Sequence, residues 1–174
     1  MERTFVMLKP DCVVRGMIGK VISKLENKGL KIVGLKMVKL RSKTVEQLYS
    51  KHVDRPFFPY LSKFLRRTPV VCAIIEGKNV IEVVRKMCGI TSGREAEGGT
   101  IRGDLSMSMR MNIIHASDTP EMVEREIAMF FKPREIHDWK HPLWPLMYDE
   151  TELEGGPSPP SGRPRKTGKE DEPQ

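Results

Sequence analysis

The 174-residue chain has few cysteines and no long hydrophobic run. Cys12, Cys72 and Cys88 are odd in number, widely spaced and without a CxxC pair, which argues against a disulfide framework or a zinc knuckle. The longest apolar runs, such as residues 70–75, have the length of a strand, and the N-terminus lacks the basic-then-apolar layout of a signal peptide. We therefore expect free thiols and a cytoplasmic protein with no membrane partner.

The composition predicts one folded domain followed by a tail. With 39% hydrophobic and 30% charged residues, the chain is long enough to bury a core of its own. Residues 151–174 contain five prolines, four glycines and one large apolar residue, Leu153, so we expect a disordered tail after a domain over residues 1–150. The tail carries four basic and five acidic residues, which leaves residues 1–150 with a formal charge of +8. Such a surplus attracts polyanions without distinguishing nucleotides from nucleic acid.

The hydrophobic pattern predicts four strands separated by helices. Strands are expected at residues 4–8, 30–40, 70–75 and around Ile113; helices are expected at residues 18–29, in a pair between 44 and 65, at 80–89 and at 120–131. The segment TVEQ at residues 44–47 has capping-box spacing, and residues 90–111 form a long loop. This order favours a single-domain α/β (α+β) fold, a ferredoxin-like antiparallel four-stranded sheet with surrounding helices, which we expect on one face of the sheet.

His115 is the first candidate for a working residue, because it lies where a predicted strand meets a helix start. In the segment NIIHASD at residues 112–118, the apolar couplet ends a buried strand, and Ser117, Asp118 or Thr119 can cap the helix that Pro120 opens. A neutral imidazole at such a junction can be a nucleophile, a base or a metal ligand. The alternative is a core histidine bonded to backbone.

Cations and aromatics elsewhere in the chain suit an anionic, flat ligand. Lys9 directly follows the first strand, and Arg85, Arg94 and Arg102 lie on the helix and loop before His115. Guanidinium groups match phosphate oxygens bidentately, although scattered surface arginines are the alternative. The segment RPFF at residues 55–58 places two phenylalanines between helices, where they hold a flat ligand or belong to the core.

Glu126 is the candidate partner of His115. It lies eleven residues further along, about two turns into the following helix, where it can face back and accept a proton-bearing ring nitrogen. His137 and His141 have helical spacing, but WKHP at residues 139–142 discourages a helix and offers no third ligand, so we expect no protein-built metal site there. His52 is expected to be structural or solvated.

Four segments together resemble the signature segments of nucleoside diphosphate kinases. They are KPD at residues 9–11, RPFF at 55–58, GTIRGD at 99–104 and NIIHASD at 112–118, in the family's order and spacing. The resemblance covers about residues 2–148. It implies a phosphotransferase that passes the γ-phosphate of a nucleoside triphosphate, typically ATP, to a nucleoside diphosphate by a ping-pong route through a phosphohistidine, with broad base and sugar specificity.

The resemblance also assigns roles to residues of this chain. His115 would attack through its δ nitrogen, Glu126 would orient the ring, Ser117 would support that carboxylate, and Lys9 and Tyr49 would lie beside the transferring group. The nucleotide-binding residues would be Arg85, Thr91 and Arg102 for phosphates, Asn112 with Lys9 for the ribose, Phe57 stacked on the base, and Leu61 flanking it. Mg²⁺ would arrive on the nucleotide phosphates, without a metal site built by the protein. A homo-oligomer is implied, a hexamer first and a tetramer second.

The chain departs from the usual family pattern at Cys12 and Ala116, where glycine is common, and at residues 90–93, where a more acidic, proline-containing stretch is usual.

Two other functions fit the sequence less well. An RNA-binding sheet needs several exposed aromatics, but the first and third strands carry only Phe5, so nucleic-acid binding is not indicated. A non-catalytic regulatory or scaffolding role is disfavoured because His115, Lys9, Arg102 and Asn112 occur together.

Overall fold

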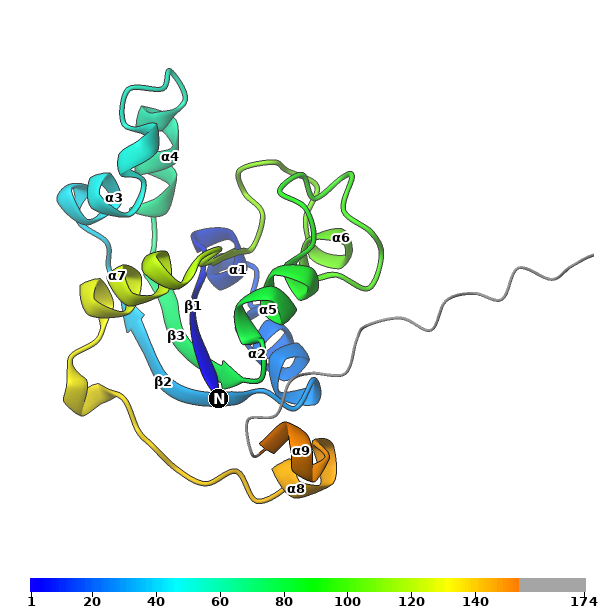
Figure 1. The fold of residues 1–174 in the computed structure, drawn as a ribbon. Coiled ribbons are helices and arrows are strands. Elements are labelled where there is room, and N and C mark those ends of the chain that lie inside the picture. The colour runs from blue at the N-terminus through cyan, green and yellow to red at the C-terminus, as the bar shows by residue number, and fades with distance from the viewer. Residues whose placement is uncertain (154–174) are drawn as a thin grey trace, which may run out of the picture. The chain divides into compact units, whose positions relative to one another are not determined.

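The sheet of this protein has four antiparallel strands in the order β2-β3-β1-β4. A computed structural model describes residues 1–153 and divides the chain into two compact units, residues 1–141 and the residues from Pro142 onward. In the first unit the strands are β1 (Glu2–Leu8), β2 (Lys31–Val38), β3 (Val70–Gly77) and β4 (Ile114–Ala116) (Figure 1). This confirms the predicted ferredoxin-like antiparallel sheet.

Helices pack on both faces of the sheet, which corrects the expectation of one face. They are α1 (Pro10–Val14), α2 (Ile18–Asn27), α3 (Ser42–Leu48), α4 (Phe58–Leu65), α5 (Val80–Cys88), α6 (Ile101–Leu105) and α7 (Pro120–Phe130), with 3₁₀ turns η1 (Ser50–His52) and η2 (Pro133–Glu135). Val6 and Leu8 of β1 join a buried cluster with residues of α2 and α5, whereas Phe5 and Met7 join a second cluster with residues of α3, α4 and α7. β3 is buried at every position, so both faces need cover.

Covering both faces also removes the platform that the RNA-binding rival needs. Phe5, the aromatic residue of β1, is fully buried and stacks on Phe130 of α7, with ring centroids 5.0 Å apart. The sheet face that carries Phe5 therefore packs against helices and is not open for base stacking.

Local capping chemistry explains the helix boundaries around the site. Thr119 is the residue that caps α7: its hydroxyl accepts a hydrogen bond from the Met122 amide, and Pro120 opens the helix as predicted. The capping box predicted at residues 44–47 is not used, because α3 already begins at Ser42. Two short helices were missed: α1 begins at Pro10 directly after β1, and α6 interrupts the predicted long loop, capped by Thr100.

The second unit contains two short helices within the described residues, α8 (Trp144–Met147) and α9 (Glu150–Leu153). The predicted tail begins inside α9, and its residues 154–174 lie outside the described part of the chain, so the domain boundary at residue 150 stays a prediction. The three cysteines are free, as predicted, and all three are buried. Within residues 1–153, no helix combines the length and apolar character needed to cross a membrane.

Candidate active site

His115 lies on β4 with its side chain 18% exposed, and one of its ring nitrogens is already engaged. Nε2 lies 2.9 Å from Oε2 of Glu126, and the Ser117 hydroxyl donates to that same oxygen at 2.6 Å. Glu126 is completely buried on α7. When Nε2 donates its proton to this carboxylate, Nδ1 keeps its lone pair, which leaves Nδ1 as the nucleophilic nitrogen.

A cavity of about 310 Å³ lies in front of His115. Its lining includes seven residues predicted from the sequence, namely Lys9, Tyr49, Arg85, Thr91, Arg102, Asn112 and His115. Glu126 contacts the His115 ring, Ser117 contacts Glu126, and neither is part of the lining; Phe57 and Leu61 are also outside it. The structure thus brings together the residues expected around a transferring phosphate.

Lys9 and Asn112 form a buried hydrogen-bonded pair at the sheet end. The Lys9 ammonium donates to Oδ1 of Asn112 at 2.6 Å, and the Asn112 amide donates to the carbonyls of Thr91 at 2.8 Å and Met109 at 2.9 Å. Burial, and then the nearby Arg102 guanidinium, lower the pKa of Lys9 to about 8. Lys9 is therefore mostly a cation at neutral pH and loses its charge as the pH rises above about 8.

The Arg102 guanidinium is held in place by hydrogen bonds to two backbone carbonyls. Its Nη1 donates to the Gly89 carbonyl at 2.7 Å and its Nη2 to the Ile114 carbonyl at 2.9 Å, which joins the end of α5 to β4. The buried Nε has no hydrogen-bond partner among the described residues. Arg85, by contrast, is an exposed arginine at the cavity wall. The two arginines thus offer the cavity one fixed and one adjustable positive charge.

Tyr49 supplies a neutral hydroxyl near His115. Its ring packs edge-on against His115, with centroids 5.9 Å apart, and its buried hydroxyl has no hydrogen-bond partner in the part of the chain that is described. Burial, and then the Glu126 carboxylate, raise the pKa of Tyr49 above its usual value. Tyr49 therefore remains a proton donor over the whole physiological range, and an unsatisfied donor at this place suits an anionic ligand.

Phe57 and Leu61 lie at the α4 side of the site, where their environments differ. Phe57 is half-buried, with the His52 ring at 5.8 Å and the Arg110 guanidinium carbon 5.0 Å from its centroid. Leu61 is only 6% exposed and belongs to the hydrophobic cluster against which Phe57 packs. Phe57 is thus accessible to a flat ligand, whereas Leu61 lies behind it in the core.

Several residues of the site were missed or misassigned by sequence reasoning. Asp118 and Arg125 line the cavity, although Asp118 was considered only as a helix cap and Arg125 was overlooked beside Glu126. Asp11 accepts a hydrogen bond from the Ile113 amide at 2.9 Å. Ile113 has a φ of 69°, a strained value for a β-branched residue, and the Lys9 amide donates to its carbonyl at 2.8 Å. The sequence contains both segments, KPD and NIIHASD, but it does not show that they contact each other in the fold.

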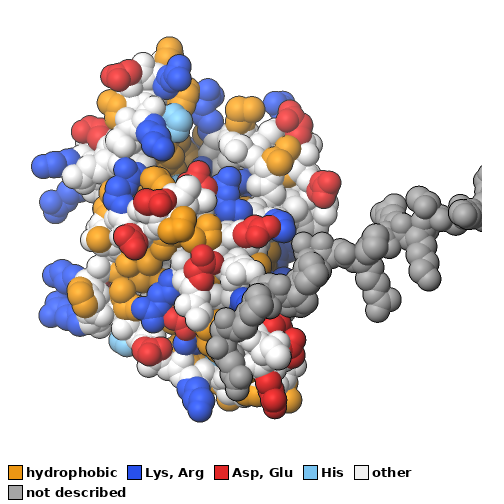
Figure 2. Space-filling model, viewed as in Figure 1, with side chains coloured by type: hydrophobic (Ala, Val, Ile, Leu, Met, Phe, Trp, Pro, Cys, Tyr) orange, Lys and Arg blue, Asp and Glu red, His pale blue; other side chains and the backbone are white. Residues whose placement is uncertain are grey.

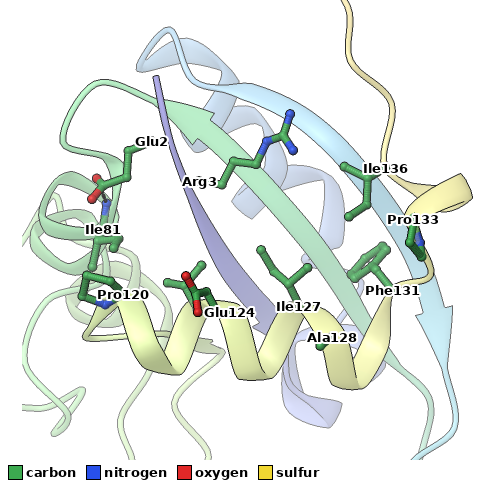
Figure 3. A pocket seen from close by; sticks show the side chains of 11 residues that line it. Glu2, Arg3, Ile81, Pro120, Glu124, Ile127, Ala128, Phe131, Pro133 and Ile136 are labelled. Atoms are coloured by element: carbon green, nitrogen blue, oxygen red, sulfur yellow. Dashed lines mark hydrogen bonds between the residues drawn. The ribbon is translucent and has the colours of Figure 1, made fainter. Parts of the chain in front are cut away.

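A larger apolar groove of about 630 Å³ lies elsewhere, along α7 (Figure 3). Its apolar lining comes from α5, α7 and the segment after α7, whereas β1 contributes the charged Glu2 and Arg3. Hydrophobic side chains gather beside α7 in the space-filling view (Figure 2). None of the predicted site residues lines it. The smaller cavity is therefore the candidate active site, because His115 and the cations meet there.

Comparison with known proteins gives consistent matches. The family model described as nucleoside diphosphate kinase matches residues 2–136. A nucleoside diphosphate kinase of Archaeoglobus fulgidus is 47% identical over 150 residues, covering 86% of this chain and 99% of that protein. One from Staphylothermus marinus is 52% identical over 138 residues, covering 79% and 98%. The solved structure of a halophilic nucleoside diphosphate kinase from Halobacterium salinarum in complex with CDP has a TM-score of 0.82 at 41% identity, covering 85% of this chain and 99% of that one.

Proposed function

Since the chain belongs to the nucleoside diphosphate kinase family and is therefore a phosphotransferase, we propose that it transfers the γ-phosphate of a nucleoside triphosphate, typically ATP, to a nucleoside diphosphate through a phosphohistidine at His115. One observation carries this proposal: Nε2 of His115 is held by the buried Glu126, itself held by Ser117, while the ring lines a cavity rich in cations. The solved relative bound to CDP supports a nucleoside diphosphate as the ligand class.

The proposed reaction has two halves. In the first, the Nδ1 lone pair of His115 attacks the γ-phosphorus, a nitrogen–phosphorus bond forms, the bond to the bridging β–γ oxygen breaks, and the nucleoside diphosphate leaves. In the second, a terminal oxygen of another nucleoside diphosphate attacks the same phosphorus and the nitrogen–phosphorus bond breaks. Glu126, which holds the Nε2 proton, stabilises the positive charge that the ring acquires between the two halves.

Lys9, Tyr49, Arg85, Thr91 and Arg102 are proposed to bind the phosphates in this cavity. Phosphoryl transfer depends on positioning and on neutralising charge, so a fixed imidazole among cations and one protonated hydroxyl suits it. The fixed Arg102 shapes the cavity, and the exposed Arg85 adjusts to the incoming phosphate.

The ribose and base are proposed to bind between Asn112 with Lys9 at one end and Phe57 at the other. Phe57 would stack on the base, and Leu61, which belongs to the cluster against which Phe57 packs, would flank the base. Because stacking accepts any flat base, we propose broad specificity for base and sugar.

Mg²⁺ is proposed to enter with the nucleotide. Asp118 is the one carboxylate in the cavity lining, and no three His, Cys, Asp or Glu side chains within residues 1–153 gather closely enough to hold a metal ion. This donor set fits an ion that is carried by phosphate oxygens, with Asp118 alone available from the protein. When bound, Mg²⁺ would neutralise part of the phosphate charge.

We propose a cytoplasmic homo-oligomer, with a hexamer first and a tetramer second, in which residues 1–150 form the kinase domain. β2 is an edge strand, and its Leu35 and Met37 are 53% and 57% exposed, so a second subunit would bury apolar surface there. The three free thiols suit a reducing compartment. Sedimentation of the full chain measures the subunit number, and a monomer at micromolar concentration would contradict the oligomer.

The decisive experiment is phosphoenzyme formation. Protein incubated with labelled ATP and Mg²⁺ should acquire label in acid-labile, alkali-stable form, and added GDP, CDP or dTDP should each discharge it. Folded protein that takes up no label would refute the proposed mechanism.

A further inference from the structure

Arg110 occupies the face of Phe57 on which the base is proposed to stack. Its guanidinium carbon lies 5.0 Å from the ring centroid, a cation–π distance. The two residues come from segments far apart in the sequence, Phe57 from the start of α4 and Arg110 from the loop between α6 and β4. The pair therefore joins the helical and loop sides of the nucleotide site.

The backbone that carries Arg110 is fixed by the residues proposed to hold the ribose. The Lys9 ammonium donates to the Arg110 carbonyl at 3.4 Å, and the Asn112 amide donates to the Met109 carbonyl at 2.9 Å. The Ser108 hydroxyl accepts from the Arg110 amide at 3.2 Å. The side chain itself is exposed. Arg110 is thus an adjustable side chain on a backbone whose position is set by the sugar-binding residues.

A row of rings connects this pair to the nucleophile. The centroids of His115 and Tyr49 are 5.9 Å apart, those of Tyr49 and His52 are 6.4 Å apart, and those of His52 and Phe57 are 5.8 Å apart. A nucleotide with its terminal phosphate at His115 and its sugar at Asn112 extends its base toward the end of this row. The base then meets Phe57 on one face and Arg110 on the other.

We propose that Arg110 caps the base on the face opposite Phe57 and favours purine over pyrimidine diphosphates. This rests on the proposed function. A base stacked between Phe57 and Arg110 lies about 3.5 to 4 Å from each, so the guanidinium and the ring must be about 7 to 8 Å apart. From its present distance of 5.0 Å, the guanidinium moves outward by about 2 to 3 Å to admit the base. Guanidinium planes stack well on aromatic faces, and a purine offers the larger face.

The test compares Arg110→Ala with the parent enzyme in phosphoenzyme discharge by four acceptors. We expect the KM for GDP and ADP to rise about two- to fivefold, the KM for CDP and UDP to rise less than twofold, and kcat to stay near the parent value, since His115 is untouched. Arg110→Lys keeps the charge but loses the planar group, so it should not restore the purine preference. Arg94→Ala, which removes an exposed arginine outside the cavity lining, is the matched control and should change none of these values.

An equal rise in KM for all four acceptors, rescued by Arg110→Lys, would mean that Arg110 only attracts anions, and would overturn the proposal. A lower KM for every acceptor would show that Arg110 obstructs the site, and would overturn it too. Failure of the kinase mechanism itself gives a different result, because the parent enzyme would then take up no label. A labelled parent whose purine-to-pyrimidine ratio is unmoved by Arg110→Ala counts against Arg110 alone.

Discussion

The two ends of the candidate site are built differently. At the phosphate end, Lys9, Arg102 and Glu126 are each at most 6% exposed and held by hydrogen bonds between 2.6 and 2.9 Å. At the base end, Phe57 is half-buried and Arg110 is exposed, and the contacts described for their side chains are ring contacts, which are less directional than hydrogen bonds. In the proposed binding mode, directional bonds thus surround the phosphates, which all nucleotides share, and adaptable surfaces meet the base, which varies.

The largest expected effect is at the phosphate end. His115→Ala should abolish phosphoenzyme labelling while leaving nucleotide affinity, measured by calorimetry, close to that of the parent, because the binding groups are other residues. His137→Ala, a histidine outside the cavity lining, serves as control and should label normally. Exchange by His115→Ala at nearly the parent rate would reveal a second nucleophile and remove the basis of the comparison.

Glu126→Gln tests whether the buried carboxylate acts on the chemical step. We expect kcat to fall on the order of 10²- to 10³-fold, since a fixed negative charge that stabilises the developing imidazolium is lost. KM should change little. Glu124→Gln, on the exposed face of the same helix, is the matched control. A loss that appears in KM instead would mean that Glu126 shapes the binding site and leaves the chemistry alone.

Phe57→Ala tests the base end. Base–aromatic stacking is worth about 1 to 3 kcal/mol, so we expect KM to rise roughly 5- to 150-fold for all acceptors with kcat within about threefold. The exposed Tyr60 on the same helix provides the control, and Tyr60→Ala should be close to neutral. If Phe57→Ala instead lowered kcat as Glu126→Gln does, the two ends would not be functionally separate.

The smallest expected effect is a pH dependence of nucleotide binding. The pKa of Lys9 is about 8 in the folded protein and 10.5 for an unperturbed lysine, the value expected in the unfolded chain. Between these two pH values the unfolded chain therefore binds one more proton than the folded protein. KM should therefore rise several-fold as the pH passes 8, because the cation is lost. Over the same interval Lys9 should make the free energy of unfolding increase with pH, because burying its neutral form costs less than burying its charged form. Lys9→Gln should flatten both profiles. A KM that is unchanged up to pH 9.5 would show that Lys9 remains charged.

Sequence reasoning succeeded where the determinant is local. Thr119 and Pro120 specify the start of α7, and counting two helical turns correctly brought Glu126 back to His115. It failed where the determinant is a contact between distant segments. The helices on the second face of the sheet, the Asp11–Ile113 bond and the Arg110–Phe57 pair each join residues that no local period relates. The fold and the contact between Glu126 and His115 were therefore predictable, whereas the arrangement of Phe57 and Arg110 was not.

The strained turn at Ile113 also bears on the order in which the protein becomes competent during synthesis. Its φ of 69° is sustained by Asp11 and by the Lys9 amide, two residues made more than a hundred positions earlier. Such a conformation costs on the order of 1 to 3 kcal/mol and persists only where its surroundings hold it. A growing chain that has not yet delivered residues 113–116 to the edge of β1 has its first three strands and the cations of the cavity, but His115 is not yet in place. The proposed acceptance of phosphate by His115 is thus one of the last properties that the emerging polypeptide would gain.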